Sequence, residues 1–505
     1  MSTEGDTPPR DLAQHFTPPD VARLVWRLVE GLAPVRRGTW TVADPSAGEG
    51  ALLRAAGARG RVQLAGLEID AELAARARAA GLGVRCGDGL IDSPGSALEG
   101  ACDAVVGNPP YGRCSRVLND AQIAAVLAAD EYSIWHGPRA RRQTEARLRA
   151  AAVEHLFLER ALQLVRPGGL VVYVLPEGLF SNSRTQLVRD WILARAEVLA
   201  VVALPARVFR RPGLHAKAAL LALRRRPTNR RRARPASMVC PTADAGSKAA
   251  VLEQLLDTAL ALQRAPDRRS DGVAVPAPSL AGARWDAAYW LNDPTPELER
   301  CPHPLAPLGD SVELLTYGPI VTGRRPQPLD EGVRVIGQGD FNDVGLCPEP
   351  RLLVRAGSVY DPPRSRVRPG DLLLPRSGAG SLGRNRMAVY DAPDRANIGC
   401  FVNLVRLRDL NPYYVWAYFR TPVGWAQIRR LINGSGVPNI SFAEIRSLRI
   451  PRIGTEVQAR VEARYRREVS LLRQAAAAIA FGRLVDDLAR YVSGESDLPA
   501  GKPVR

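Results

Sequence analysis

The stretch Cys102–Gly112, CDAVVGNPPYG, is an apolar run that ends in an amide, two prolines and an aromatic ring. Its first six residues are typical of a strand buried on both faces, because such strands are apolar almost without interruption. Proline offers a sheet no N–H group, so the strand must end at Asn108. The surrounding sequence indicates the role of this strand end.

Six further apolar runs flank this one, and Ala- and Leu-rich stretches of helical character separate them. This alternation predicts a doubly wound α/β sheet, in which ligands bind at the carboxyl ends of the strands. The predicted strands are TWTVAD, VQLAGLEID, GVRCGD, CDAVVGN, GGLVVYVLP, EVLAVVALP and AALLALRR.

The amino-acid composition limits which partners the protein can be expected to bind and in which cellular compartment it is expected. With 505 residues and a formal net charge of +17, the chain is expected to form two domains and to bind a polyanion such as nucleic acid or anionic lipid. Arginine enrichment is also typical of GC-rich genomes. The seven cysteines lack a C-x-x-C pair, which argues against a metal site and against disulfides. With no apolar leader or membrane-length run, we expect a cytoplasmic protein without membrane contact.

Small and acidic residues follow the first three predicted strands. DPSAGEG, residues 44–50, is a turn of small residues whose backbone amides can approach a ligand closely. Glu68 ends the next strand, at the spacing typical of an acid that binds ribose hydroxyls, and Asp88 ends the third, where it can accept from an adenine amino group. Each acid taken alone is also typical of a loop cap. Without G-x-G-x-x-G or a phosphate-binding lysine, a nucleoside fits better than a dinucleotide.

With the fourth strand ending in NPPY, residues 14–226 resemble the S-adenosylmethionine-dependent N6-adenine DNA methyltransferases of the gamma order, like the Taq enzyme. The resemblance implies a Rossmann-like sheet of seven strands, the last one antiparallel, and S-adenosyl-L-methionine as cofactor. The motifs that carry it occur in the family's order: QHFTPPDVARLVWRLV, DPSAGEG, GLEID, GDG, GNPPYG, EHLFLERALQLVRPGG and VFRRPGLHAKAALLALRR.

The chemistry of adenine gives the NPPY loop a role. The lone pair of the exocyclic nitrogen is delocalised into the ring, so acceptors for both its hydrogens, the Asn108 side-chain oxygen and the Pro109 carbonyl, would make it more nucleophilic. Together with Pro109, Pro110 would hold that carbonyl rigidly. Tyr111 offers an aromatic face to a base that has left the duplex stack. The resemblance places Phe209 against the same adenine, for which core packing is the alternative.

The resemblance also implies cofactor contacts. Thr17 and Pro18 would close over the methionine part of the cofactor, with Phe157 as an apolar wall beside it. Residues 113–152 match nothing in the family, and Lys217 is expected either to meet DNA phosphate or to face water. The full predicted cofactor-binding set is Thr17, Pro18, Asp44, Pro45, Ala47, Gly48, Glu68, Ile69, Asp88, Gly89, Asn108 and Phe157.

Residues 285–453 resemble a target recognition domain of the type I restriction specificity-subunit kind, through PGDLLLPRSG and GSGVPNIS. Such a domain would read base edges in the major groove. Stabilisation of glycine-rich turns is the alternative for each candidate reader, and the preceding RRRPTNRRRARP, residues 224–235, fits either a hinge or a phosphate contact. The candidate readers are Arg376, Ser377, Arg384 and Asn385.

These patterns divide the chain into six predicted segments. We expect no nuclease domain before FTPPD and no metal-dependent nuclease signature. The segments are a disordered N-terminus (1–11), the catalytic methyltransferase domain (12–226), a basic linker with a connecting helix (227–283), an α+β recognition domain (284–454), a helical segment (455–492) and a disordered tail (493–505).

The sequence therefore predicts a site-specific adenine DNA methyltransferase that acts on double-stranded DNA in a restriction-modification or phage-defence system. Cleavage would belong to a separate partner protein. A single recognition domain favours a monomer on an asymmetric site. Two alternatives remain: an NPPY methyltransferase that acts on RNA or on protein glutamine, and a DNA-binding specificity module with an inert methyltransferase half.

Overall fold

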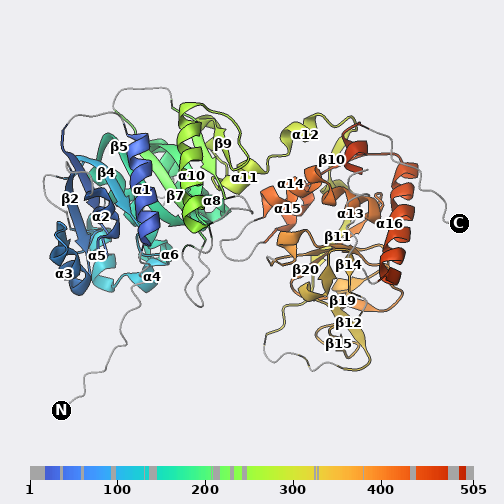
Figure 1. Ribbon diagram of the computed structural model, residues 1–505. Coiled ribbons are helices and arrows are strands. Elements are labelled where there is room, and N and C mark those ends of the chain that lie inside the picture. The colour runs from blue at the N-terminus through green and yellow to red at the C-terminus, as the bar shows by residue number, and fades with distance from the viewer. Residues whose placement is uncertain are drawn as a thin grey trace, which may run out of the picture. The chain divides into compact units, whose positions relative to one another are not determined.

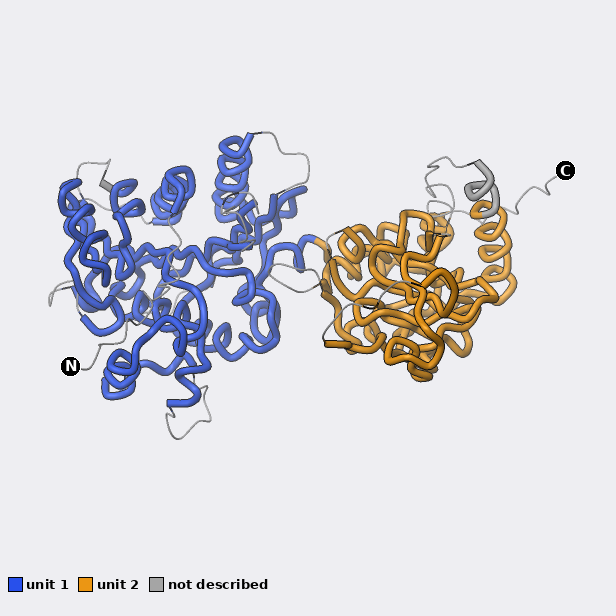
Figure 2. The backbone as a smooth tube through the Cα atoms, turned by 90° about the horizontal axis from the view of Figure 1, so that it is seen from below, with its two compact units in different colours: residues 1–291 blue, residues 292–505 orange. Residues whose placement is uncertain are grey.

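The computed structural model divides the chain into two compact units, Met1–Leu291 and Asn292–Arg505, which Figure 2 colours separately. Each unit has its own hydrophobic cores. The residues that the structure describes are 17–33, 38–57, 62–92, 98–129, 131–135, 145–205, 208, 217–227, 233–241, 247–322, 326, 329–347, 349–378, 380–432, 439–475 and 488–495.

Among these described residues, the first unit is built on a sheet of nine strands in the order β3-β2-β1-β4-β5-β7-β6-β8-β9. Their bounds are β1 (Trp40–Asp44), β2 (Val62–Glu68), β3 (Val84–Cys86), β4 (Cys102–Gly107), β5 (Val165–Pro176), β6 (Ala196–Ala203), β7 (Ala218–Arg225), β8 (Ala236–Val239) and β9 (Gly272–Val275). β7 is antiparallel to β5 and β6, and β9 is antiparallel to β8, whereas the other neighbours run parallel. β4 is buried along its whole length, which explains its uninterrupted apolar sequence.

The predicted doubly wound α/β sheet is confirmed, and β7 is antiparallel as the resemblance implies. In the described part of the chain, however, β8 and β9 extend the sheet from the expected seven strands to nine. Both have four residues and lie in the segment 227–283, which the sequence predicts to be a linker with one helix. Runs this short beside an arginine-rich stretch carry too little periodicity to be distinguished from a loop. Two short parts of that segment therefore belong to the sheet, and the segment as a whole belongs to the first unit.

Helices cover both faces of this sheet (Figure 1). Those of the first unit are α1 (Pro19–Leu32), α2 (Ala51–Gly57), α3 (Ala71–Ala79), α4 (Cys114–Val117), α5 (Asp120–Ala129), α6 (Glu145–Ala150), α7 (Val153–Leu164), α8 (Gly178–Ser181), η1 (Ser183–Thr185), α9 (Gln186–Arg195), α10 (Lys248–Arg264), η2 (Ala277–Leu280) and α11 (Ala287–Leu291). α1, α2, α3 and α10 share one core with Ala104 and Val106 of β4. α7 and α9 share the other core with Val105, because successive strand residues face opposite sides.

The first unit extends past the predicted domain boundary at 284. Trp285 is fully buried in the first unit's core, and its backbone N–H donates to a carbonyl of α8 at 2.8 Å. The buried Arg189 of α9 donates to the Ala283 carbonyl at 3.1 Å, which ties the same segment to the sheet. The division therefore falls after Leu291, since a buried tryptophan contributes a large apolar area to the unit that holds it.

The second unit is an α+β fold of several small sheets (Figure 1). β11-β20-β17-β18 form an antiparallel sheet, and β15-β12-β19-β16 form a mixed one. Helices α13 to α16 pack on the first of these sheets around Trp416, and a second core lies between the two sheets around Ile398.

The bounds in this unit are α12 (Thr295–Glu299), β10 (Leu305–Pro307), η3 (Leu308–Ser311), β11 (Val312–Tyr317), β12 (Val333–Ile336), η4 (Gln338–Asp340), β13 (Phe341–Asn342), β14 (Gly345–Leu346), β15 (Leu353–Val354), η5 (Pro363–Ser365), β16 (Arg366–Val367), β17 (Leu372–Pro375), η6 (Leu382–Arg384), β18 (Ala388–Val389), β19 (Ala396–Ile398), β20 (Val402–Leu407), α13 (Pro412–Arg420), α14 (Pro422–Leu431), α15 (Phe442–Ser447), β21 (Arg449–Pro451) and α16 (Thr455–Ala475). In the described part of both units, no helix combines the length and the hydrophobicity of a membrane span.

Candidate functional site

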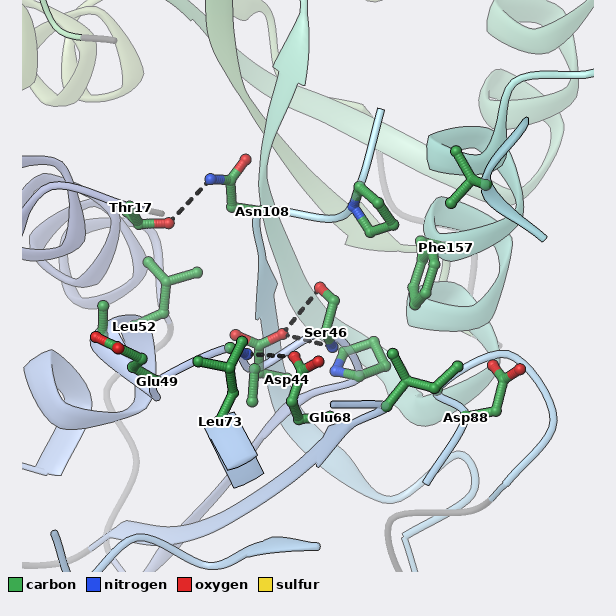
Figure 3. A pocket seen from close by; sticks show the side chains of 18 of the residues that line it. Thr17, Asp44, Ser46, Glu49, Leu52, Glu68, Leu73, Asp88, Asn108 and Phe157 are labelled. Atoms are coloured by element: carbon green, nitrogen blue, oxygen red, sulfur yellow. Dashed lines mark hydrogen bonds between the residues drawn. The ribbon is translucent and has the colours of Figure 1, made fainter. Parts of the chain in front are cut away.

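Four strands of the first unit end around one cavity. β1, β2, β3 and β4 run parallel, so their carboxyl ends lie at the same edge of the sheet. The strand order reverses between β1 and β4, which is where doubly wound sheets open a crevice for a ligand. A cavity of about 1010 Å³, its open mouth included, lies at this point, and Figure 3 shows it.

Asp44, the last residue of β1, is a buried acid that lines the cavity. One carboxyl oxygen accepts from the Ser46 backbone N–H at 2.9 Å and from the Ser46 hydroxyl at 3.3 Å. Burial raises the pKa of Asp44 from 3.8 to about 7; the hydrogen bonds from Ser46 oppose the rise, and the charge of Glu68 adds to it. The protonation state of this carboxyl is therefore sensitive to a charge placed beside it near neutral pH.

Glu68, the last residue of β2, holds the small-residue turn in position. Its carboxylate accepts from the Gly48 backbone N–H at 2.7 Å and from the Asp70 backbone N–H at 3.0 Å. Gly48 has a φ of 53°, a conformation that favours glycine. Burial raises the pKa of Glu68, and the N–H groups of Asp70 and Gly48 counteract that rise. Glu68 thus both lines the cavity and fixes one of its loops.

Asp88 follows β3 and is held by α5, a helix within the run 113–152. Its carboxylate accepts from the Leu90 backbone N–H at 2.9 Å and from the Gln122 side-chain amide at 2.5 Å. At Gly89 a Cβ atom would lie 1.7 Å from the Pro45 carbonyl oxygen, so this position admits only glycine. The backbone after β3 therefore packs directly on the small-residue turn.

Asn108 directly follows β4 and faces the cavity across from the acids (Figure 3). Its amide nitrogen donates to the Thr17 hydroxyl at 3.0 Å. The Tyr111 hydroxyl donates to the Asn108 side-chain oxygen at 2.5 Å, and it also lies 3.1 Å from the Val174 carbonyl oxygen. Burial raises the pKa of Tyr111 well above its ordinary value, so the phenol stays a neutral donor.

The NPPY loop is fixed at both ends. After it, the Gly112 backbone N–H donates to the Glu154 carboxylate of α7 at 3.0 Å. Before it, Gly107 packs against the Tyr173 ring so closely that a Cβ atom would lie 2.7 Å from a ring carbon. Between these anchors Pro109 is buried. Two anchors and two prolines leave the Pro109 carbonyl little rotational freedom.

The structure brings nearly all of the predicted cofactor-binding residues to this cavity. Pro18, the residue before α1, is not among those that line it, and of the predicted catalytic residues Asn108 and Pro110 line it whereas Pro109 and Tyr111 do not. Phe209 lies outside the described residues. The predicted residues that line the cavity are Thr17, Asp44, Pro45, Ala47, Gly48, Glu68, Ile69, Asp88, Gly89, Asn108 and Phe157.

Part of the wall was absent from the sequence prediction. Val117, Leu118 and Gln122 come from the run 113–152, whose alanine-rich composition gave no signal of a site. The other lining residues that the sequence analysis did not name lie within a few positions of predicted ones. Their closeness to the motifs in the sequence could have indicated them. These residues are Ser46, Glu49, Ala51, Leu52 and Leu73.

Two of the candidate DNA readers make contacts within the second unit. Ser377 is buried, and its hydroxyl and carbonyl oxygens accept from the Gln338 side-chain amide at 2.6 and 2.9 Å. Asn385 has a φ of 55° and donates to the Phe419 carbonyl at 2.9 Å. These contacts hold both side chains within the second unit, and a DNA contact by either residue stays a prediction. Arg384 is exposed at the end of η6, and a DNA contact there stays a prediction.

Lys217 lies next to the start of β7, and its ammonium group is 3.7 Å from the Glu177 carboxylate. The lysine side chain is partly exposed, so this pair leaves room for a further contact. A role in binding DNA phosphate stays a prediction.

The fold and the cavity together define a doubly wound α/β protein with an acid-lined ligand site at the switch point of its sheet. Residues 7–235 match the family model described as N-6 DNA Methylase. The match includes every residue that lines the cavity. The likeness to N6 DNA methyltransferases predicted from the motifs is therefore confirmed for this segment, whereas the gamma-order subclass and the specificity-subunit likeness stay predictions.

Solved structures of restriction-modification proteins are similar to this chain at low identity. The methyltransferase subunit of a type I system from Streptococcus thermophilus is 18% identical over 53% of this chain and 56% of that one, with a TM-score of 0.41. The type IIG restriction endonuclease BpuSI is 13% identical over 92% and 61%, with a TM-score of 0.45. The M protein of the type I enzyme EcoKI is 16% identical over 51% and 56%, with a TM-score of 0.37. The chain spans less than two thirds of each of these proteins.

Proposed function

We propose that this protein transfers the methyl group of S-adenosyl-L-methionine to N6 of an adenine flipped out of duplex DNA. The observation that carries the proposal is the position of Asn108, which directly follows β4 and shares a cavity with the acids at three neighbouring strand ends. The family match of residues 7–235 supports the same reaction. The second unit would select the sequence, and a separate protein would cleave DNA in a restriction-modification or defence system.

The cavity suits a nucleoside with a cationic tail. Its described wall carries four acids and neither lysine nor arginine, so it would repel a phosphate group. The acids are Asp44, Glu49, Glu68 and Asp88. Glu68 would accept from the ribose hydroxyls and Asp88 from the adenine amino group. Asp44 would pair with the ammonium group of the methionine part. Bound there, the cofactor supplies a methyl group activated by its sulfonium charge.

Asn108 and Pro109 would prepare the nucleophile. The Asn108 side-chain oxygen and the Pro109 carbonyl accept the two N6 hydrogens, which leaves the nitrogen lone pair directed at the methyl carbon. The N–C bond forms as the C–S bond breaks, and N6 then loses one proton to solvent. To accept a hydrogen bond from the adenine amine, the Asn108 oxygen gives up the hydrogen bond that it accepts from the Tyr111 hydroxyl. That hydroxyl can donate to the Val174 carbonyl instead.

Substitution of Tyr111 tests this exchange. Tyr111→Phe keeps the aromatic ring and releases the Asn108 oxygen, so we expect methyl transfer close to that of the wild type. Tyr111→Ala also removes the surface on which a flipped base stacks, and we expect a loss of ~1–3 kcal/mol in transition-state stabilisation. Single-turnover transfer from labelled cofactor measures both. Equal losses in the two variants would mean that the hydroxyl, rather than the ring, serves the reaction.

The pKa of Asp44 predicts how pH affects cofactor binding. In this structure the pKa is about 7, and an ammonium group beside the carboxyl would lower it. Binding would then release a proton, so affinity should rise as pH increases from 6 to 7.5. The rise should end near pH 8, where the α-amino group of the cofactor begins to deprotonate, at about 7.7–8.0. Calorimetry in buffers of different ionisation enthalpy measures the released proton.

Asp44→Asn supplies the control, because an amide cannot titrate in this range. We expect weaker binding by this variant with a flat pH profile below pH 7.5. A wild-type affinity that stays constant between pH 6 and 7.5 would contradict the pairing of Asp44 with the cofactor.

Labelled cofactor tests the reaction itself. The full-length protein is incubated with duplex DNA, with RNA and with a protein that carries an accessible glutamine. We expect label in DNA, recovered as N6-methyladenine. Label in RNA or protein alone would identify one of the alternative NPPY reactions. DNA binding without cofactor binding or transfer would identify an inert specificity module.

A further inference from the structure

Several strands of the second unit end at one edge, in the region where β11, β20, β19 and β12 lie in Figure 1. β11 ends at Tyr317 and β17 at Pro375, directly beside the start of β20. The Arg376 backbone N–H donates to the Phe401 carbonyl at 2.7 Å, and the Gly399 N–H donates to a carbonyl of β12 at 2.9 Å. The edge is therefore a continuous hydrogen-bonded platform.

Arg376 lies on this platform with its guanidinium held by an aromatic ring. The guanidinium carbon is 4.3 Å from the centroid of the Tyr317 ring, which in turn lies 5.8 Å from the Phe442 ring. No ion pair or hydrogen bond joins the guanidinium to any residue that the structure describes. By contrast, Arg406 of the same sheet pairs with Asp371 at 2.7 Å. Stacking on Tyr317 thus restricts the orientation of the Arg376 guanidinium, while its N–H groups remain available for a ligand.

Two exposed apolar side chains belong to segments that meet at this edge. Phe401 is 57% exposed, and its backbone carbonyl is the one that accepts from Arg376. Ile320, 67% exposed, follows the exit of β11. The chain that leaves β11 passes close to the turn after β19. A Cβ atom at Gly318 would lie only 1.9 Å from the Ile398 carbonyl oxygen, so the close approach requires glycine there. An available guanidinium beside apolar side chains matches the base edges of a DNA groove, which present both acceptors and methyl groups.

Asn403 adds an independent observation at the same edge. It is fully buried, and neither atom of its side-chain amide has a hydrogen-bond partner among the described residues. It is directly opposite Tyr317 in β11 and Leu374 in β17, so its side chain lies on the same face of the sheet as the Tyr317 ring. A buried amide without a partner is destabilising, and such groups occur where a ligand or water completes the network.

We propose that this edge, the Arg376 patch (Tyr317, Ile320, Arg376 and Phe401), docks in the major groove of the target DNA. The Arg376 guanidinium would donate two hydrogen bonds to O6 and N7 of one guanine, the base edge that best fits its fork. The inference rests on the proposed function and names a contact by which the second unit selects a sequence. A phosphate group would also fit the fork, and the experiment separates the two.

Methylation of a library of randomised duplexes tests the proposal. The full-length wild type, Arg376→Ala and Arg376→Lys are each supplied with cofactor, and the modified adenines are located by sequencing. We expect the wild-type motif to contain a guanine for which preference falls about 10- to 100-fold in Arg376→Ala, with the other positions unchanged. Arg376→Lys, which keeps the charge, should bind DNA more tightly than Arg376→Ala yet still discriminate poorly at that position.

Two controls separate a direct contact from misfolding. Arg368→Ala removes an exposed arginine at the opposite end of β17 and should leave the motif unchanged. Replacing the affected guanine by 7-deazaguanine removes the N7 acceptor; it should reduce methylation by the wild type and have no further effect on Arg376→Ala. This second test compares substrates on one protein, so a loss of stability cannot imitate it.

The contradicting outcomes are distinct. An Arg376→Ala motif with every preference intact would overturn the inference. Uniformly weaker methylation across all sequences would identify a phosphate contact and would also overturn it. A wild type that methylates no duplex would overturn the proposed function and this inference with it.

Discussion

Asn108→Ala should slow methyl transfer by about 10²–10³-fold while leaving the affinity for S-adenosyl-L-methionine almost unchanged. The side-chain oxygen is the proposed acceptor for one N6 hydrogen, and loss of one preorganised polar group of this kind costs about 10²–10³-fold in rate. The cofactor contacts are proposed on the other side of the cavity, from Asp44, Glu68 and Asp88. Single-turnover transfer and equilibrium cofactor binding, measured on the same preparation, give the two quantities.

One hydrogen bond of Asn108 also links this residue to the cofactor side of the cavity. The Asn108 amide donates to the Thr17 hydroxyl at 3.0 Å, and Thr17 also lines the cavity. We therefore expect a small decrease in cofactor affinity beside the large loss in rate. Asn108→Asp keeps an oxygen near Thr17 and adds a charge, so it should bind cofactor like the wild type. Parallel losses of binding and rate in Asn108→Ala would contradict the assignment of this residue to the base.

Glu68→Ala should have the opposite pattern, with cofactor binding lost first. The carboxylate is proposed to accept from both ribose hydroxyls, and hydrogen bonds to a charged group contribute about 1.5–3 kcal/mol each. It also accepts from the Gly48 and Asp70 N–H groups, so its removal releases the small-residue turn. We expect the dissociation constant for cofactor to rise by at least about 10²-fold, as measured by calorimetry.

Glu72→Ala is the matched control. Glu72 is an exposed acid of α3 that pairs with Arg76 at 2.5 Å, and it does not line the cavity. Its substitution should leave cofactor affinity within error of the wild type. An equal effect of the two substitutions would indicate general electrostatics rather than a ribose contact.

Continuous apolar runs were sufficient to predict the centre of the first unit. β4 and β5 are buried on both faces, so their sequences differ sharply from the amphipathic helices between them. The common position of the residues at the strand ends was equally predictable, because parallel strands in a doubly wound sheet bring their carboxyl ends to one edge, whereas the roles of these residues stay predictions. Sequence order alone therefore placed Asp44, Glu68 and Asn108 in a common site.

The remaining features depend on contacts between residues far apart in sequence. β8 and β9 are four-residue strands whose place in the sheet follows from pairing with β6 and with each other. Gln122 reaches the cavity because α5 folds back over the end of β3, where its amide meets Asp88. Trp285 joins the first unit through burial among helices of that unit. No local pattern encodes such long-range packing.

A structure of the protein with cofactor and duplex DNA would test the central claim most directly. The measured quantities are the distances from N6 of an extruded adenine to the Asn108 side-chain oxygen and to the Pro109 carbonyl oxygen. We predict that both are about 3 Å, the length of ordinary N–H···O hydrogen bonds, with the Tyr111 hydroxyl turned to Val174. An NPPY loop that faces solvent with the bound DNA elsewhere, and every base still stacked, would contradict the proposed function.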